Sequence, residues 1–104
     1  MTDPNRRPKV LVADKIADGG LDLLRQHFDV DVDLGPDAEY LLSIISGYEG
    51  LVVRSATKVT AGVIDRATNL KVIARAGAGL DTIDVPAALS AGIQVVNSPD
   101  ANTI

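Results

Sequence analysis

The sequence has no cysteine and no tryptophan, and it contains only one histidine, two tyrosines and one phenylalanine. Without cysteine, this chain can form no disulfide, no thiolate metal site and no cysteine nucleophile, which fits a reducing cytoplasmic compartment. Basic residues are also few, because ten Lys and Arg stand against fourteen Asp and Glu and leave a net charge of −4. With so few cations and aromatic rings, we expect no nucleic-acid partner.

Long hydrophobic runs are missing as well. The N-terminal segment MTDPNRRPK is polar, and the apolar run after it is far shorter than a membrane span of about 20 residues or the apolar core of a signal peptide. We therefore expect no membrane partner and a flexible arm over residues 1–8. Residues 9–104 are then one domain or less, and 46% hydrophobic residues can supply a modest core.

Short apolar runs alternate along the chain with segments of helical periodicity. The predicted strands are residues 9–14, 29–34, 50–55, 71–75 and 94–97, and the predicted helices are residues 17–28, 38–46, 61–67 and 85–91. Parallel strands need crossovers, and those crossovers are right-handed. The alternation therefore predicts an α/β fold, a flavodoxin-like doubly wound parallel sheet of five strands in the order 2-1-3-4-5, with helices on both faces.

The second predicted strand alternates apolar residues with Asp29, Asp31 and Asp33. This pattern is typical of a half-exposed edge strand whose carboxylates oppose edge-to-edge pairing. The same three carboxylates suggest a cation site, but a row on one face of a strand wraps a metal ion poorly. We therefore expect a solvated edge and no metal.

Polar residues and glycine mark the predicted helix ends. Asp18 and Thr60 are expected to be N-caps, and Gly92 is expected to end the last helix. His27 falls in the last turn of the first helix, where the helix dipole favours its positive charge. No second histidine or acidic cluster accompanies it, so we expect no catalytic role.

The most informative segment is KVIARAGAGLDTID, residues 71–84. Its strand ends in Arg75 and runs into a turn that contains Gly77 and Gly79. Glycine allows close approach of a ligand to the backbone, and exposed N–H groups beside a guanidinium can bind an anion. The alternative interpretation is a tight turn next to a solvated arginine.

A second strand repeats this pattern. The segment GLVVRS ends in Arg54 and Ser55, and the last strand ends in Asn97, with Asn102 close behind it. In an open parallel sheet, ligands bind beyond the carboxyl ends of the strands. We therefore expect two arginines, turn N–H groups and amides to hold a small polyanion at this edge.

No reaction centre accompanies the predicted anion site. Lys58 and Asp81 lie near the edge, but neither has a partner that would make it a general base or nucleophile. The pair Gly77 and Gly79 is not a dinucleotide fingerprint, because the third glycine of G-x-G-x-x-G would fall at Thr82. The residues alone therefore indicate a binding site and no catalytic residue.

The segments VVRSATKVT, residues 52–60, and VIARAGAGLDTIDVPAALSAGIQVVNSPDANT, residues 72–103, resemble the D-isomer-specific 2-hydroxyacid dehydrogenases. RSATKVT is most similar to the members that act on a small phosphorylated 2-hydroxy acid. The resemblance implies a NAD-dependent oxidoreductase in which residues 9–104 are the N-terminal part of the substrate-binding domain. The nucleotide-binding domain and the family's catalytic Arg, Glu and His would lie beyond Ile104, so we expect this chain to be inactive alone and the full-length enzyme to be a homo-oligomer.

The same resemblance implies individual roles at the edge of the sheet. The implied substrate contacts are Arg54, Ser55, Arg75 and Asn102, with the N–H groups around Ala76 and Gly77 taking the carboxylate. Relatives often carry a threonine at position 78 that contacts the cofactor. Here the residue is Ala78, which lacks that side chain.

The alternative is a stand-alone flavodoxin-like module that binds an anion or acts as a regulatory receiver. A receiver needs acids at the end of its first strand and a phosphorylatable aspartate at the end of its third. The first strand does end in Asp14, but the third ends in Arg54. This difference favours the dehydrogenase interpretation.

Overall fold

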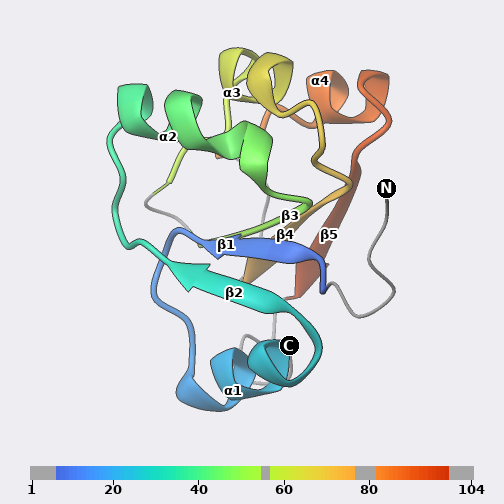
Figure 1. Cartoon of the computed structure of the whole chain (residues 1–104). Helices are drawn as coiled ribbons and strands as arrows, with labels where there is room; N and C mark the ends of the chain where they lie inside the picture. Colours follow the sequence, from blue (N-terminus) through green and yellow to red (C-terminus); the bar gives the residue numbers. More distant parts are fainter. Residues whose placement is uncertain (1–6, 55–56, 77–81, 99–104) are drawn as a thin grey trace.

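The computed structural model describes residues 7–54, 57–76 and 82–98, and a parallel sheet lies at its centre (Figure 1). Among these residues the sheet has five strands in the order β2-β1-β3-β4-β5, and every neighbouring pair is parallel. The predicted fold class and strand order are therefore confirmed. The strands are β1 (Lys9–Val12), β2 (Asp29–Val32), β3 (Gly50–Val53), β4 (Val72–Ala76) and β5 (Gln94–Ser98).

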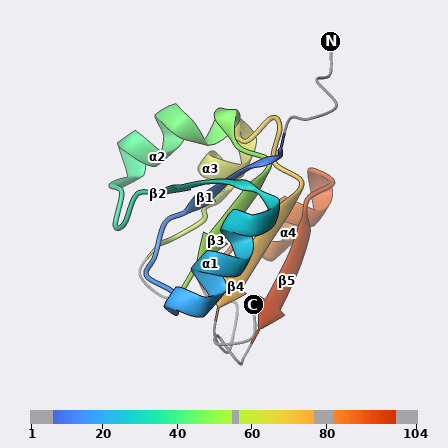
Figure 2. The same ribbon diagram turned by 60° about the horizontal axis from the view of Figure 1, so that its bottom comes forward.

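Helices cover both faces of the sheet. In Figures 1 and 2, α1 (Asp18–His27) lies on one face, while α2 (Ala38–Ile44), α3 (Ala61–Arg66) and α4 (Val85–Ser90) line the other. A single 3₁₀ turn, η1 (Ile45–Gly47), follows α2. The chain passes from β1 outward to β2 and then back across to β3. The topological switch point, where ligands bind in such sheets, therefore lies between β1 and β3.

The two faces of the sheet bury separate apolar clusters. The cluster under α2, α3 and α4 includes Leu11, Leu51 and Ile73, all at most 1% exposed. The smaller cluster under α1 includes Val12 and Val52. The predicted inward residues of the first helix, Leu21, Leu24 and Phe28, pack against this second cluster. Burial of each large aliphatic side chain contributes roughly 1.5–3 kcal/mol, so these clusters are the main source of stability.

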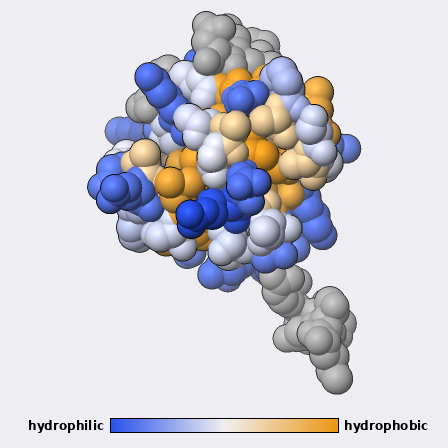
Figure 3. Space-filling view, turned by 90° about the horizontal axis from the view of Figure 1, so that it is seen from above, coloured by the Kyte–Doolittle hydropathy of each residue, from blue (hydrophilic) through white to orange (hydrophobic). Residues whose placement is uncertain are grey.

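The helix layer on the larger cluster is not uniformly polar on its outer side. Seen from above in Figure 3, apolar side chains show between hydrophilic ones across the middle of this face. Leu89 and Tyr40, on the helices of this layer, are 60% and 47% exposed. Single exposed apolar residues of this kind are normal on a protein surface and do not by themselves mark a binding site.

The helix-end predictions have mixed outcomes. Thr60 is the N-cap of α3, because its Oγ1 accepts a hydrogen bond from the Val63 N–H at 3.4 Å. Gly92 follows the C-cap residue of α4, Ala91, and has a φ of +80°, a backbone conformation that favours glycine. The prediction for Asp18 is wrong, because the helix begins at Asp18 itself and its cap position is Ala17, which has no side-chain acceptor. Asp18 contributes only its negative charge to the positive end of the helix.

Candidate functional site

The carboxyl ends of the strands, where the sequence predicted an anion site, lie at the lower edge of the sheet in Figure 2. Arg54 directly follows β3, and Arg75 and Ala76 are the last two residues of β4. The Cα partner of Arg75 is Val53, so the backbone of Arg54 lies one residue beyond the backbone of Arg75. The other residues that the sequence suggested, Ser55, Gly77, Ala78, Gly79, Asp81 and Asn102, lie outside the described residues.

At this edge, the buried carboxylate of Asp14 links the residues that follow β1 to those that follow β3. The sequence pattern did not single it out as a site residue. Asp14 follows β1 and is only 5% exposed. Its Oδ2 accepts hydrogen bonds from the Arg54 N–H at 2.7 Å and the Thr57 N–H at 3.0 Å. Its Oδ1 accepts a third from the Thr57 hydroxyl at 2.7 Å. The only signal in the sequence is the acid that closes the apolar run KVLVAD, and nothing local indicates its partners.

These hydrogen bonds also explain why two strands end earlier than predicted. β1 ends at Val12 and β3 at Val53, whereas the apolar runs predicted strands as far as Asp14 and Ser55. The Arg54 N–H, which would continue a strand ladder, donates to the Asp14 side chain instead. Both β1 and β3 therefore end at the switch point between them.

The side chain of Arg54 is exposed, and its hydrogen bond to the protein is weak. Its Nη1 donates to the backbone carbonyl of Lys15 at 3.3 Å, which is long for an N–H···O bond. That carbonyl belongs to the turn between β1 and α1. An anion with a better acceptor geometry can replace this single contact at little cost.

The segment that follows Arg54 is also held from the β4 side. Val59 and Ile83 form a parallel bridge between the residues after β3 and those before α4. The Val59 N–H donates to the Thr82 carbonyl at 2.8 Å, and the Asp84 N–H donates to the Val59 carbonyl at 2.9 Å. The described backbone around the candidate site is thus held by the residues that follow β1 and by those that precede α4.

Arg75 approaches the same edge from the opposite face of the sheet. Ile73 lies in the cluster under α2, α3 and α4, whereas Ala74 packs against the cluster under α1. Because side chains alternate along a strand, half-buried Arg75 leaves β4 on the face that Ile73 occupies. The Arg54 guanidinium instead contacts the turn that leads into α1. An anion held by both guanidiniums would therefore sit at the edge itself and not on either face.

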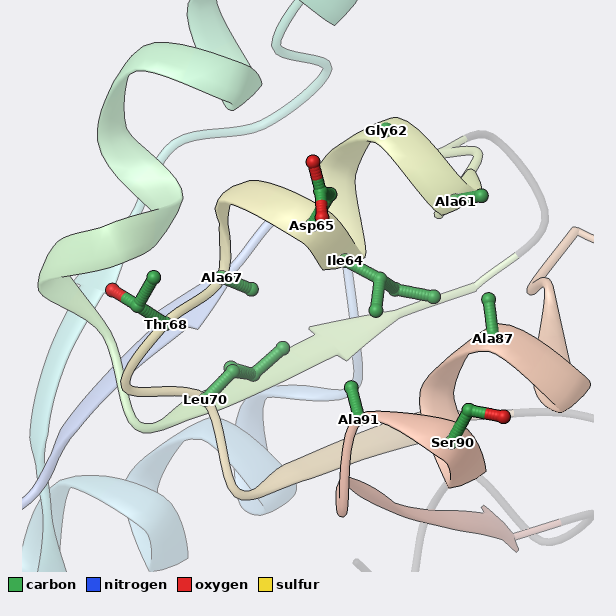
Figure 4. A pocket seen from close by; sticks show the side chains of 10 residues that line it. All are labelled: Ala61, Gly62, Ile64, Asp65, Ala67, Thr68, Leu70, Ala87, Ser90 and Ala91. Carbon is green, nitrogen blue, oxygen red and sulfur yellow. The ribbon is translucent and has the colours of Figure 1, made fainter.

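A cavity of about 710 Å³ in the described residues does not coincide with this edge. It is a groove between α3 and α4 (Figure 4), and most of its lining side chains are small or apolar. Asp65 is the one charged residue in the lining. A groove with a negative charge and no cation does not suit an anion. A smaller cavity of about 320 Å³ lies nearer the candidate site, between residues 58–61 and 82–84.

The switch-point crevice does not fit a dinucleotide. The turn from β1 to α1 begins Ala13-Asp14-Lys15-Ile16 and contains no glycine before Gly19, inside the helix. Asp14 places a negative charge where a pyrophosphate would lie, and the nearby N–H groups of Arg54 and Thr57 already donate to it. A nicotinamide cofactor would need residues other than those described.

Neither a metal site nor a membrane-spanning helix is found in the described part of the chain. No set of three His, Asp or Glu side chains there could hold a metal ion. No helix there is long and apolar enough to cross a membrane. His27 is exposed at the end of α1, with its ring edge-on to Phe28 at a centroid distance of 6.4 Å.

Comparisons with known proteins identify relatives over nearly the whole chain. Residues 10–104 match the family model described as D-isomer specific 2-hydroxyacid dehydrogenase, catalytic domain. A D-3-phosphoglycerate dehydrogenase from Synechocystis sp. is 50% identical over 96 residues, which are 92% of this chain and 17% of that protein.

Two solved structures have the same fold. A protein from Pyrococcus horikoshii OT3 superimposes with a TM-score of 0.85 at 38% identity, covering 88% of this chain and 28% of that one. The NAD⁺-bound 3-phosphoglycerate dehydrogenase of Entamoeba histolytica has a TM-score of 0.77 at 27% identity, with coverages of 88% and 32%.

The chain thus spans only a small part of the proteins that it matches, 17% of the length of the Synechocystis enzyme. The family model nevertheless extends over all five strands except the first residue of β1. The match therefore includes both arginines of the candidate site and the buried Asp14, which accepts the Arg54 N–H. The chain belongs to the D-isomer specific 2-hydroxyacid dehydrogenases, a family of oxidoreductases.

Proposed function

We propose that this chain supplies the substrate-anion contacts of a cytoplasmic, homo-oligomeric D-3-phosphoglycerate dehydrogenase. Such an enzyme oxidises the 2-hydroxyl of 3-phosphoglycerate to the ketone of 3-phosphohydroxypyruvate with NAD, in L-serine biosynthesis. The 50% identity with the Synechocystis enzyme supports this substrate. Residues 9–104 would be the N-terminal part of the substrate-binding domain. Because the described residues do not fit NAD, the chain alone would bind substrate without oxidising it.

The observation that carries the proposal is the placement of Arg54, directly after β3, beside Arg75 on the neighbouring β4, at the carboxyl edge. 3-Phosphoglycerate has a phosphate at one end and a carboxylate at the other, so it needs two cationic or N–H-rich pockets a short distance apart. Two guanidiniums that reach the edge from opposite faces of the sheet suit such a ligand. Charge-assisted hydrogen bonds of this kind contribute roughly 1.5–3 kcal/mol each.

The individual roles follow the family resemblance. The proposed substrate contacts are Arg54, Ser55, Arg75 and Asn102, and the N–H groups around Ala76 and Gly77 would take the carboxylate. A guanidinium can give a phosphate or a carboxylate two parallel hydrogen bonds, which a lysine cannot. Ala78 would face the cofactor without a polar contact of its own.

Calorimetric titration of the 104-residue chain with 3-phosphoglycerate tests the proposal, with NAD as the comparison ligand. We expect the phosphoacid to bind and NAD to show no measurable binding. Arg66→Ala is the control variant, because Arg66 is an exposed arginine at the end of α3, away from the strand ends. Absence of binding by a chain shown to be folded, or equal weakening by Arg66→Ala and Arg54→Ala, would contradict the proposal.

The structure does not favour the alternative of a stand-alone regulatory module. In a receiver, the acid after the first strand helps to bind a metal ion. Here both oxygens of the Asp14 carboxylate accept hydrogen bonds from the chain itself. Binding of Mg²⁺ would have to break those bonds, so titration with Mg²⁺ is a direct test, and we expect no binding.

A further inference from the structure

An anion from the protein itself occupies the switch point between β1 and β3. In open parallel sheets the switch point is the usual ligand position, where backbone N–H groups face the ligand. Here the Asp14 carboxylate lies at that position, and Asp14 is only 5% exposed. Asp14 receives the N–H groups of Arg54 and Thr57 and the Thr57 hydroxyl, at 2.7, 3.0 and 2.7 Å.

A buried carboxylate places strict demands on its surroundings. Taking the charge out of water is costly unless its oxygens receive hydrogen bonds, and short charge-assisted bonds are the strong ones. The three donors to Asp14 all come from the segment directly after β3. Arg54 and Thr57 can therefore not move away from Asp14 without leaving a buried charge unsatisfied.

This restraint acts directly on a residue of the proposed substrate site. The backbone N–H of Arg54 is one of the three donors, so the Arg54 backbone is tied to the buried Asp14 carboxylate, which follows β1. The guanidinium of the same residue is exposed and has one long contact, to the Lys15 carbonyl at 3.3 Å. The backbone of Arg54 is thus held firmly while its charged end remains accessible.

We propose that Asp14, together with the Thr57 hydroxyl, is a positioning residue of the substrate site. It acts through the backbone of Arg54, which it holds so that the guanidinium meets the substrate anion at the edge of the sheet. Asp14 itself does not touch the substrate. This inference rests on the proposed function, because it assumes that Arg54 binds that anion.

A merely structural role for Asp14 makes a different prediction. If Asp14 only stabilised the fold, its replacement would lower the melting temperature, and the folded molecules would bind the anion as before. If Asp14 positions Arg54, the folded molecules themselves bind more weakly, and the loss depends on the presence of the Arg54 side chain. A double-variant cycle separates the two roles.

The experiment measures the affinity of the 104-residue chain for 3-phosphoglycerate by calorimetry, under conditions where every variant is folded. Asp14→Asn leaves at most one carbonyl oxygen for three donors, and Thr57→Val removes the hydroxyl. We expect each to weaken binding about tenfold or more. Thr57→Ser keeps the hydroxyl and should stay within about threefold of the native chain. Asp22→Asn, an equal charge change on the exposed side of α1, should have no effect.

The Arg54→Ala background provides the decisive comparison. There we expect Asp14→Asn to cause no further loss of affinity beyond about twofold, because its effect passes through the missing guanidinium. A further tenfold loss in that background would overturn the inference, since Asp14 would then act by another route. Native affinity of a folded Asp14→Asn chain would overturn it as well.

Amide hydrogen exchange distinguishes failure of this inference from failure of the proposed function. In Asp14→Asn we expect the amides of Arg54 and Thr57 to exchange about tenfold faster or more, with no change at Leu11 and Ile73 in the core. If the native chain does not bind 3-phosphoglycerate, the proposed function fails, and local exchange would still show that Asp14 holds the Arg54 backbone. Unchanged exchange at Arg54, or equal acceleration throughout the core, would overturn the positioning role itself.

Discussion

The phenol of Tyr48 donates a hydrogen bond to Asp31 Oδ2 on the edge strand β2, at 2.8 Å. Lys9 Nζ lies 3.9 Å from the same carboxylate oxygen and 5.4 Å from the centroid of the Tyr48 ring. Asp31 was expected to be solvated like its neighbours in the acidic row, but it is half-buried and paired. The Asp31 carboxylate therefore links the edge strand β2 to the segment before β3.

The Tyr48 contact predicts a loss of stability at alkaline pH. Burial, reinforced by the hydrogen bond and the negative charge of Asp31, raises the pKa of Tyr48 well above its usual value of 10.0. Below about pH 10 the phenol is neutral in both states, so its contribution to folding is complete. Above about pH 10 the unfolded chain loses the proton first, and stability falls as the pH rises towards the folded-state pKa.

Tyr48→Phe tests this interpretation by urea unfolding at about pH 7 and about pH 11. We expect the variant to lose about 1 kcal/mol at neutral pH and to show a smaller further loss than the native chain at alkaline pH. Tyr40→Phe is the comparison, because Tyr40 is 47% exposed and should matter little at neutral pH. An unchanged alkaline loss in Tyr48→Phe would rule out Tyr48 as its source.

Two glycine-to-alanine substitutions should change stability in opposite directions. A Cβ on Gly50, in the central strand β3, would lie 3.2 Å from Val10 Cγ2 and 3.6 Å from Val72 Cγ1. Crowding at this buried position should destabilise by about 1–2 kcal/mol. A Cβ on Gly19, in α1, would meet nothing within 4 Å, so alanine there should stabilise by about 0.5–1 kcal/mol. Thermal unfolding of the two variants checks the sign of each stability change. A stabilised Gly50→Ala variant would show that β1 and β4 shift to accommodate the added methyl group.

Thr60→Ala should weaken the start of α3. The Thr60 hydroxyl accepts the Val63 N–H, and loss of an N-cap acceptor costs about 0.5–1 kcal/mol where the bond is long, as here at 3.4 Å. Thr60→Ser keeps the hydroxyl and should retain native stability in chemical denaturation. Equal losses in the two variants would point to the methyl group of Thr60 and not to the cap.

The two arginines should contribute separately to anion binding. If both contact the substrate, Arg54→Ala and Arg75→Ala each weaken binding of 3-phosphoglycerate by about 2 kcal/mol, roughly thirtyfold. Because Arg54 is exposed and Arg75 half-buried, added salt should weaken the Arg54 contribution more. Titrations at two ionic strengths measure this difference. Native affinity in both variants would exclude the proposed site.

Local sequence patterns were sufficient to predict much of this fold. The apolar run of β1 and the stripe of Leu21, Leu24 and Phe28 each follow from side-chain spacing within a few residues. The strand order follows from the same alternation, because short right-handed crossovers leave few arrangements of a parallel sheet. The capping role of Thr60 could likewise be predicted from the sequence, since a cap and its partner are only three residues apart.

The sequence also placed Arg54 and Arg75 at the carboxyl edge, because each follows or ends an apolar strand. Periodicity within each strand did not show that their side chains reach this edge from opposite faces. That relationship depends on the register of β3 against β4 and on where each strand ends. The roles of Ser55, Gly77, Ala78 and Asn102 remain predictions, because these residues lie outside the described part of the chain.

The sequence by itself determined the succession of helices and strands, the sheet order and the edge at which polar groups gather, since these depend on short-range patterns. The tertiary structure alone decided which groups meet there. Asp14 bonds to residues 40 and 43 positions away, and Tyr48 bonds to Asp31, 17 positions away. A carboxylate looks the same in the sequence whether it is solvated or buried, and only folding brings it to the donors that decide between the two.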